Sequence, residues 1–255
     1  MLTNKFLTVG HMILMLKDIL MWTLIGKYDL KNTVNIFYDI GIKSLPIILI
    51  TSFATGMVLA LQLGIVIQNW FGYPLFVGMT VSFAFAKELS PILVSIVMAG
   101  RVGAAITAEI SSMKVTEQLD ALLSLGAHPI QYLAVPRFLG CLFMVPILVL
   151  IGYTVSLLGG LLVSVVILDL PSTVYLSDAL DTLYLSDIMH GLIKACFFAM
   201  IIAWVSIFRG FTCKQGAEGV GKATTNAVVT SIILILISDY FLTSILVALG
   251  IGNGR

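Results

Sequence analysis

Long apolar segments separated by short polar stretches dominate the chain. A helix needs about 20 predominantly apolar residues to cross the hydrocarbon core of a bilayer. Five segments reach that length, and they cover residues 45–68, 75–100 or a little beyond, 138–168, 187–208 and 225–249. The pattern therefore predicts an all-α membrane protein with five transmembrane helices.

The stretch before the first span has a different pattern. Residues 2–24 are apolar over much of their length but carry Lys5, His11, Lys17 and Asp18. This composition favours an N-terminal helix in the plane of the membrane interface, with a sixth span as the alternative. We expect residues 1–44 to form an N-terminal interfacial or elbow region and residues 45–255 to form the five-span domain. No internal repeat or linker divides the chain, so a single domain overall is expected.

Composition supports the membrane assignment. The chain has 255 residues, of which 59% are hydrophobic and 11% charged, whereas a soluble domain is roughly half apolar and about a quarter charged. The net charge of +1 argues against a nucleic-acid binder, which needs a concentrated basic face. Cys141, Cys196 and Cys213 are unclustered, so they suggest neither a disulfide framework nor a metal site.

Lysine and arginine residues are distributed unevenly between the two sides of the predicted spans. Eleven of the 14 fall on one side, and these are Lys5, Lys17, Lys27, Lys31, Lys43, Arg101, Lys114, Arg137, Arg209, Lys214 and Lys222. Only Arg255 falls on the other side, which instead carries Asp169, Asp178, Asp181 and Asp187. By the positive-inside rule, the N-terminus is predicted to be cytoplasmic and the C-terminus external.

The loop between the second and third spans contains a short predicted helix, residues 116–125. Thr116 can cap it, Glu117 suits the positive end of the helix dipole, and Gly126 followed by Pro129 ends it. Its apolar positions are Leu119, Leu122 and Leu123, and its polar positions are Glu117, Gln118 and Asp120. Such an amphipathic helix either rests on the membrane or docks as a coupling helix into a soluble partner.

Small residues recur at helical spacing near the end of the second span. Gly100, Ala104 and Ala108 are four residues apart, and Ala99 and Gly103 offer a second ridge. In lipid, such ridges allow helices to approach closely. The ridges indicate either tight packing within the chain or a seam between parts that move.

Three ionisable residues lie inside predicted spans: Lys87, Glu88 and Lys194. Each costs about 2.5–3.5 kcal/mol at the bilayer centre, so they need partners, water or a polar ligand. Lys87 and Glu88 point about 100° apart on a helix and pair poorly with each other, whereas Glu88 can pair with Lys194. Pro91 can kink this span and free a carbonyl. The residues form either a buried structural ion pair or a functional site, and Asp239 in the fifth span is a weaker candidate.

The segment 216–223 nearly matches a phosphate-binding loop. Ala223 lacks the hydroxyl that would hold Mg²⁺, and no strand precedes the segment, so it is not expected to bind ATP. Its glycines are expected to form a turn, with Thr224 or Thr225 capping the fifth span. The sequence suggests no catalytic residues and no metal ligands. Active transport would therefore need energy from another chain or from an ion gradient.

The motifs around these features resemble the MlaE permease family over most of the chain from about Asn32 onward. The matching residues are Lys87-Glu-Leu-Ser-Pro91, Ala99-Gly-Arg-Val-Gly-Ala-Ala105, Ala108-Glu109, Met113, Thr116-Glu-Gln-Leu-Asp-Ala-Leu122, Pro136-Arg137, Gly219-Val-Gly-Lys-Ala-Thr-Thr225 and Asp239-Tyr-Phe-Leu-Thr243. Lys87 stands where arginine is usual, and Ser90 stands where glycine is usual. The first difference keeps the charge but loses bidentate contact with a phosphate.

The resemblance implies the inner-membrane permease of an ABC transporter that moves phospholipids between envelope membranes. Two copies of the permease would pair with two ATPase subunits, which bind the ATP and magnesium, and an MCE-domain protein would sit on the periplasmic side. The substrate-binding residues would be Lys87, Glu88 and Lys194. The coupling residues would be Thr116, Glu117, Gln118, Asp120 and Leu122, and the helix-packing residues would be Gly100, Gly103, Ala104 and Ala108.

Two other function classes are compatible with the residues alone. A non-transporting membrane scaffold that anchors a soluble complex would depend on the loop helix and not on the intramembrane charges. An intramembrane enzyme is disfavoured because the sequence offers no evident nucleophile–base pair.

Overall fold

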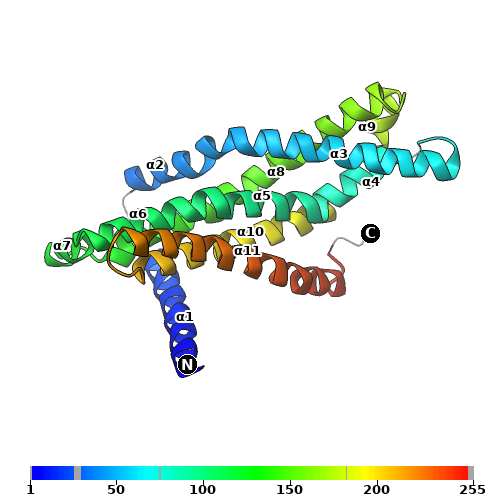
Figure 1. Ribbon diagram of the computed structural model, residues 1–255. Helices are drawn as coiled ribbons and strands as arrows, with labels where there is room; N and C mark the ends of the chain where they lie inside the picture. Colours follow the sequence, from blue (N-terminus) through cyan, green and yellow to red (C-terminus); the bar gives the residue numbers. More distant parts are fainter. Residues whose placement is uncertain (1, 26–29, 75, 182, 252–255) are drawn as a thin grey trace. The chain divides into compact units, whose positions relative to one another are not determined.

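The computed structural model describes residues 2–25, 30–74, 76–181 and 183–251. Lys27 and Arg255, which enter the charge distribution, and residue 75, the expected start of the second span, lie outside the described residues. The described chain contains helices and no strand, as the sequence predicts. Figure 1 labels the longer elements in chain order.

The helices follow one another with short connections. The α-helices are α1 (Leu2–Ile25), α2 (Leu30–Gly41), α3 (Leu45–Phe71), α4 (Val77–Ala84), α5 (Ser90–Met98), α6 (Ala104–Val115), α7 (Gln118–Ser124), α8 (Val135–Val166), α9 (Ser172–Asp181), α10 (Leu185–Phe211) and α11 (Ala217–Ala248). A 3₁₀ turn, η1 (Ile42–Ser44), joins α2 to α3. Three π-helical turns complete the set: η2 (Phe85–Leu89), η3 (Ala99–Gly103) and η4 (Ile130–Ala134).

Five helical segments are long and apolar enough to cross a membrane, which confirms the predicted number. They are Lys31–Phe71, Val77–Val115, Ile130–Val166, Leu185–Phe211 and Ala217–Ala248. Each extends beyond its predicted apolar window at one end or both, whereas the third and fifth stop one or two residues before the predicted end. Helix α1 is not among the five. Its position in the membrane interface stays a prediction.

The described residues form two compact units, each assembled from three segments. Unit 1 comprises Met1–Ser44, Met98–Met144 and Ala199–Ile235. Unit 2 comprises Leu45–Val97, Val145–Phe198 and Leu236–Arg255. Helices α8, α10 and α11 therefore contribute residues to both units.

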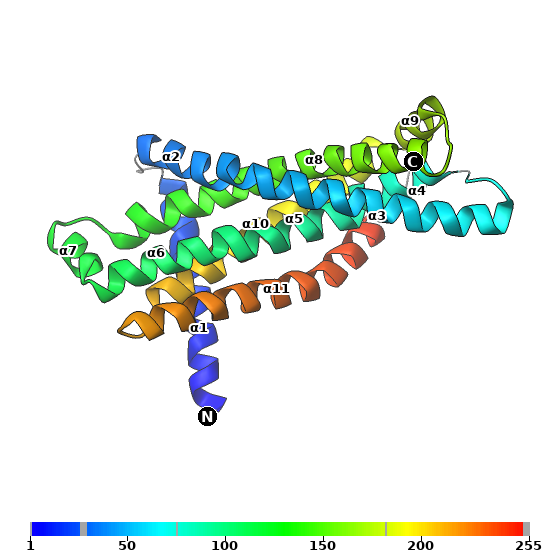
Figure 2. The ribbon, with the colours of Figure 1, turned by 45° about the horizontal axis from the view of Figure 1, so that its top comes forward.

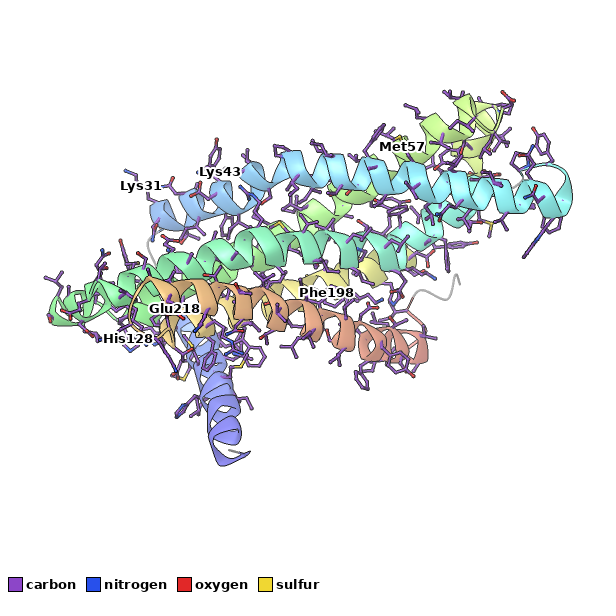
Figure 3. The ribbon with its side chains drawn as sticks, viewed as in Figure 1. Lys31, Lys43, Met57, His128, Phe198 and Glu218 are labelled. Atoms are coloured by element: carbon purple, nitrogen blue, oxygen red, sulfur yellow. The ribbon has the colours of Figure 1, made fainter. Side chains whose placement is uncertain are left out.

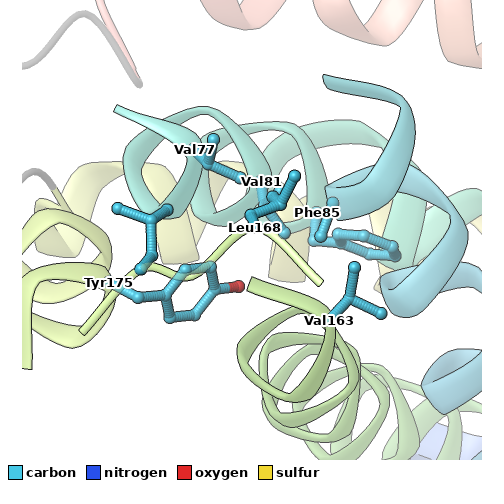
Figure 4. Close-up of a cluster of buried hydrophobic side chains, with 8 residues drawn as sticks. Val77, Val81, Phe85, Val163, Leu168 and Tyr175 are labelled. Atoms are coloured by element: carbon cyan, nitrogen blue, oxygen red, sulfur yellow. The ribbon is translucent and has the colours of Figure 1, made fainter. Parts of the chain in front are cut away.

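The core of unit 2 is built from α3, α4, α8 and α9. Its buried side chains, drawn in Figure 4, are Ala60, Val77, Val81, Phe85, Val163, Leu168, Leu170 and Tyr175. The Tyr175 hydroxyl donates a hydrogen bond to the Leu157 carbonyl at 3.3 Å, and burial raises the pKa of this hydroxyl above its usual value of 10.0. Helix α9 packs on α4 (Figure 2), where a Cβ at Gly78 would collide with the Tyr175 carbonyl. The sequence analysis did not predict α9.

Glycines let α3 and α8 approach to backbone contact within unit 2. A Cβ at Gly56 would collide with the backbone of Ser156, and one at Gly159 would collide with the Phe53 carbonyl. Because lipid supplies no hydrophobic drive between helices, such close backbone packing is a main source of association energy in a membrane protein.

Helix α1 is attached to the rest of unit 1 by specific contacts. Ile19 is fully buried. The Trp204 indole donates a hydrogen bond to the Met12 carbonyl at 2.7 Å, and the Trp22 and His128 rings lie 5.2 Å apart. His128, labelled in Figure 3, belongs to the connection between α7 and η4. Helix α1 thus packs against other parts of unit 1.

The predicted small-residue ridges have different surroundings in unit 1. A Cβ at Gly103 would lie 2.9 Å from the Ser206 hydroxyl, so this glycine permits close packing of η3 on α10. The Thr107 hydroxyl reinforces the contact by donating to the Ser206 carbonyl at 3.1 Å. Ala104 and Ala108 are half-buried, and a Cβ at Gly100 would meet no atom within 4 Å.

The end of the loop helix is as predicted, but its start is not. Helix α7 begins at Gln118, and the Thr116 hydroxyl donates back to the Ser112 carbonyl at 2.9 Å. Thr116 therefore belongs to the end of α6. The prediction that it caps α7 was wrong. At the other end Gly126 has φ +76°, and its N–H bonds the Leu123 carbonyl while the Ala127 N–H bonds the Leu122 carbonyl. This is a Schellman motif, which favours glycine at that position.

The predicted glycine turn is present only at Gly216, which has φ +90°, whereas residues 217–223 are helical. Helix α11 begins at Ala217, and the hydroxyls of Thr224 and Thr225 bond to the Val220 and Gly221 carbonyls inside the helix. Neither threonine caps the span. Only glycine fits at position 219, because a Cβ there would collide with the Lys214 carbonyl.

Candidate functional site: a charged cavity in unit 2

A cavity of about 540 Å³ lies in unit 2 next to the intramembrane charges. It is lined by Phe83, Ala84, Lys87, Glu88, Leu89, His190, Thr243, Val247 and Ile251. These residues come from α4 and η2, from α10, and from the end of α11 and the residues after it. Two charged side chains and one imidazole therefore share a cavity whose remaining walls are mainly apolar.

The π-helical turn η2 carries both charged residues of the cavity wall. Pro91 follows it, and in a regular α-helix the proline ring would clash with the carbonyl four residues earlier, at Lys87. The widened turn accommodates this, since the Ser90 N–H bonds to the Phe85 carbonyl. Pro136 follows η4 at the same distance. Pro91 was predicted to kink this span and free a carbonyl, and the helix responds to it with the π turn η2.

Lys87 is held between an acid and an aromatic ring. Its ammonium lies 3.0 Å from Asp187 Oδ1 and 3.7 Å from the centre of the Phe83 ring. The Lys87 side chain is 12% exposed, and that of Asp187 is 2% exposed. Asp187 lies in the first turn of α10, where the helix dipole favours a carboxylate. The sequence pattern placed Asp187 among the external acids and gave no indication of this pair.

Lys194 is the centre of a second group of charges. Its ammonium is fully buried, forms an ion pair with Glu88, and lies 2.8 Å from Asp239 Oδ1. The Thr243 hydroxyl lies 3.3 Å from the other oxygen of Glu88. The pair between Glu88 and Lys194 that the sequence suggests is therefore present. Asp239, the weaker candidate in the fifth span, joins it as a second acid.

The cavity wall does not include Lys194. A substrate in the cavity can reach Lys87, whereas Lys194 is covered on all sides by its own chain. This position differs from that expected of a headgroup ligand. Lys194 instead holds Glu88, which is part of the wall, and Asp239, which is not, so its influence on a bound molecule passes through Glu88.

His190 is a cavity residue that the sequence gave no reason to select. It is 2% exposed and lines the cavity, and within the described residues neither ring nitrogen has a hydrogen-bond partner. Buried polar atoms are usually satisfied, so an imidazole without a partner in a cavity wall is suited to bonding a molecule inside. Spacing cannot reveal it, because no histidine motif is involved.

Ser90 occupies a buried contact behind the cavity. Its hydroxyl donates to the Val149 carbonyl at 2.8 Å and is not among the cavity-lining atoms. The serine found where glycine is usual therefore ties α5 to α8 within unit 2.

The predicted coupling residues lie in unit 1, around α7. Thr116, Glu117, Gln118 and Asp120 are exposed, and Leu122 is half-buried. Leu119 is buried, whereas Leu123 is 55% and Leu125 is 82% exposed. The α7 region therefore presents its polar side chains outward together with Leu123 and Leu125.

Comparisons with known proteins agree with this architecture. The family model described as Permease MlaE matches residues 33–245. A protein of Rickettsia typhi named "Probable ABC transporter permease protein" is 44% identical over 212 residues, which cover 81% of this chain and 80% of the relative. A protein of Synechocystis with the same designation is 38% identical over 218 residues, covering 86% and 82%.

A plant protein is also similar. The chloroplastic protein TRIGALACTOSYLDIACYLGLYCEROL 1 of Arabidopsis thaliana is 37% identical over 221 residues, which cover 86% of this chain and 62% of the plant protein. The match to the family model covers three of the candidate membrane spans completely and all but the outer ends of the first and the fifth. The chain therefore belongs to the MlaE permease family and is a multi-pass membrane permease subunit of the ABC transporter type.

Proposed function

We propose that this permease moves phospholipids between the membranes of a cell envelope, driven by a separate ATPase subunit. The observation that carries the proposal is the cavity of unit 2, where Lys87 and Glu88 face a space with largely apolar walls. Ionisable residues at such positions usually mark the path of a polar or charged substrate. The name of the Arabidopsis relative is that of a glycolipid, which supports a lipid as the substrate class.

The dimensions of the cavity suit a headgroup. Small-molecule sites commonly measure about 300–1,000 Å³, and the 540 Å³ here lies within that range. Phe83 and Val247, which line the cavity, are 47% and 49% exposed, so the chain leaves apolar surface uncovered beside it. A headgroup can occupy the cavity while the acyl chains lie along these apolar side chains.

Residues of different charge contact different parts of the headgroup. Lys87 is the cation of the wall and contacts the phosphate. Glu88, whose side chain is 37% exposed, contacts a cationic substituent of the headgroup. Lys194 is a positioning residue that holds Glu88 and Asp239 in place. His190 bonds a hydroxyl, an ester or an amine of the same molecule.

Helix α7 is the contact that couples the permease to its ATPase. The ATPase binds ATP and magnesium and docks on the exposed residues of this helix, so that nucleotide-driven movement displaces α7. A single helical segment, Val77–Val115, contains the turn with Lys87 and Glu88 and ends just before α7. Movement of this segment would change the cavity without any bond being made or broken in the permease, which needs no cofactor of its own.

The proposed assembly has a defined orientation. Two copies of the chain pair in the inner membrane, with the N-terminus and α7 on the cytoplasmic side and the C-terminus in the periplasm. The distribution of lysine and arginine supports this orientation. An MCE-domain protein on the periplasmic side exchanges phospholipid with the permease.

The test is ATP-dependent phospholipid transfer by the permease reconstituted with its ATPase in proteoliposomes. Lys87→Gln should lower transfer about tenfold or more, because a hydrogen bond to a charged group is worth about 1.5–3 kcal/mol. Lys222→Gln is the matched control, since Lys222 forms an exposed pair with Glu218 in α11 and should leave transfer unchanged. The double variant Lys87→Asp/Asp187→Lys keeps the ion pair but moves the cation away from the cavity wall, so it should regain stability without regaining transfer.

The same experiment separates the rival functions. Transfer that survives Lys87→Gln would remove the cavity from the proposal. A complex that assembles and hydrolyses ATP but moves no lipid, and that depends only on α7, would indicate a scaffold. A chemically altered lipid among the products would indicate an intramembrane enzyme.

A further inference from the structure

A second cavity lies in unit 1 and shares no residue with the first. It measures about 490 Å³ and is lined by Asn32, Asn35, Ile36, Asp39, Ile40, Lys43, Arg101, Val102, Ala105, Ile106, Glu109 and Arg137. One wall comes from α2 and η1, one from η3 and α6, and Arg137 comes from the start of α8. Three cations and two acids therefore surround a single space.

Two of the three cations are already paired with an acid. Lys43 lies 2.6 Å from Asp39 on the same helical segment, and both side chains are more than half exposed. Arg137 is buried, donates one N–H to the Leu133 carbonyl at 2.7 Å, and lies 2.7 Å from Glu109 Oε1. Figure 3 labels Lys43 near the end of the α2–η1 segment.

Arg101 is the cation with a different environment. Its guanidinium donates to the hydroxyl of Ser44, which is fully buried and in turn donates to the Ile40 carbonyl at 2.5 Å. Within the described part of the chain, no carboxylate lies within 4 Å of Arg101. Only one of its five N–H donors is used by Ser44, and the guanidinium fork matches the geometry of a phosphate.

The backbone that carries Arg101 is also unusual. Arg101 is the central residue of the π turn η3. The turns η2 and η4 are each followed by a proline that accounts for them, whereas no proline follows η3 in residues 104–115. π turns without such a cause often occur at functional sites, because they redirect side chains at some cost in helix stability.

The remaining walls of this cavity are suited to an amphiphile. Ile36, Ile40 and Val102 line it beside the charged groups. On the other faces of α2 and η1, Val34 is 65%, Tyr38 is 52% and Ile42 is 50% exposed. A helix with one polar face and one exposed apolar face is typical of the boundary between lipid headgroups and hydrocarbon.

We propose that this cavity binds the phosphate group of a phospholipid headgroup, with Arg101 as its principal ligand and Lys43 and Arg137 completing the basic wall. Asn32 and Asn35 offer amides to the ester and glycerol oxygens, and Asp39 and Glu109 neutralise a cationic headgroup substituent. In the orientation proposed above, the lipid belongs to the cytoplasmic leaflet. A soluble phosphate is the other source of the same chemistry.

The test uses photocrosslinking in the full-length chain reconstituted with phospholipid carrying a ³²P-labelled phosphate. A benzophenone amino acid is placed at Ala105, which lines the cavity, and separately at Val34, which is exposed on α2 but does not line it. Labelling from Ala105 should exceed labelling from Val34. Arg101→Gln should lower it about ten- to a hundredfold, and Arg101→Lys should lower it less, because it keeps the charge without the fork.

Two further measurements identify the source and control for folding. Inorganic phosphate at millimolar concentration should not compete with the lipid. Competition that depends on Arg101 would support the phosphate site with a soluble ligand. A benzophenone at Phe83, in the unit 2 cavity, should give unchanged labelling in Arg101→Gln, which shows that the variant is folded. This control uses the lipid site of the proposed function, whereas the comparison of Ala105 with Val34 does not. Labelling from Ala105 equal to that from Val34, or unaffected by Arg101→Gln, would overturn the inference.

Discussion

Replacing Lys194 with methionine tests the buried charge group most sharply. The ammonium is fully buried and pairs with Glu88 and Asp239. Removing it leaves both carboxylates without their shared cation, and removing one partner of a buried pair costs about 3–5 kcal/mol. Glu88 is 37% exposed and can turn toward the cavity, whereas Asp239 is 17% exposed. Most of the cost therefore comes from Asp239, and we expect a loss of about 3 kcal/mol for Lys194→Met.

The loss can be measured as a shift in thermal unfolding. In a chain of this size about 1 kcal/mol corresponds to 2–4 °C, so Tm should fall by about 6–12 °C. The chain contains three tryptophans, whose fluorescence in detergent reports the transition. The triple variant Lys194→Met/Glu88→Gln/Asp239→Asn removes all three charges and should recover most of the loss, since a neutral packed core is often as stable as an ion pair. An unchanged Tm in the single variant, or no recovery in the triple variant, would refute this reasoning.

Three further predictions concern local structure. Gly56→Leu should prevent stable packing of α3 on α8, because even a Cβ there collides with the Ser156 backbone, whereas Gly100→Leu should be tolerated, since a Cβ at Gly100 meets no atom within 4 Å; detergent-resistant yield compares the two. Gly126→Ala should destabilise the end of α7 by about 1–2 kcal/mol because φ is positive there, and hydrogen exchange of the Ala127 amide should rise. Burial raises the pKa of Tyr175, so its contribution to stability is complete below pH 10 and is lost above it; Tyr175→Phe should weaken the fall in Tm at alkaline pH.

The number and type of the membrane spans could be predicted because they depend on length and hydropathy alone. A run of about 20 apolar residues has few alternatives to a spanning helix. The first and last residues of the spans could not be predicted in this way, because helices such as α11 continue through polar residues that no hydropathy window includes. The helix end at Gly126 was predicted correctly, because the local sequence alone determines a helix end of this kind.

Simple sequence rules failed at two positions where a backbone carbonyl four or five residues earlier decides the structure. Thr116 has the right chemistry for a cap, but its hydroxyl bonds backward into α6. The glycines near Gly219 suggested a turn, whereas Gly219 is required because the Lys214 carbonyl packs against it. In both cases residue type alone does not reveal which nearby carbonyl the residue will contact.

The charged site was only partly accessible from the sequence. The cost of burying charge correctly indicated that Glu88 and Lys194 need partners, and the pair is present. The same reasoning could not name Asp187 as the partner of Lys87, since the two residues are 100 positions apart with no shared motif. It also could not show that Lys194 lies behind the cavity wall, because burial of a particular side chain depends on how the helices pack.

Capture of phospholipid inside the cavity of unit 2 tests the central claim most directly. A benzophenone amino acid at Val247, which lines the cavity, should crosslink to co-reconstituted phospholipid more strongly than one at Ile245, which is 55% exposed on the same helix and does not line it. Lys87→Gln should lower the labelling from position 247 about tenfold and leave that from position 245 unchanged. Equal labelling at the two positions, unaffected by Lys87→Gln, would contradict the account.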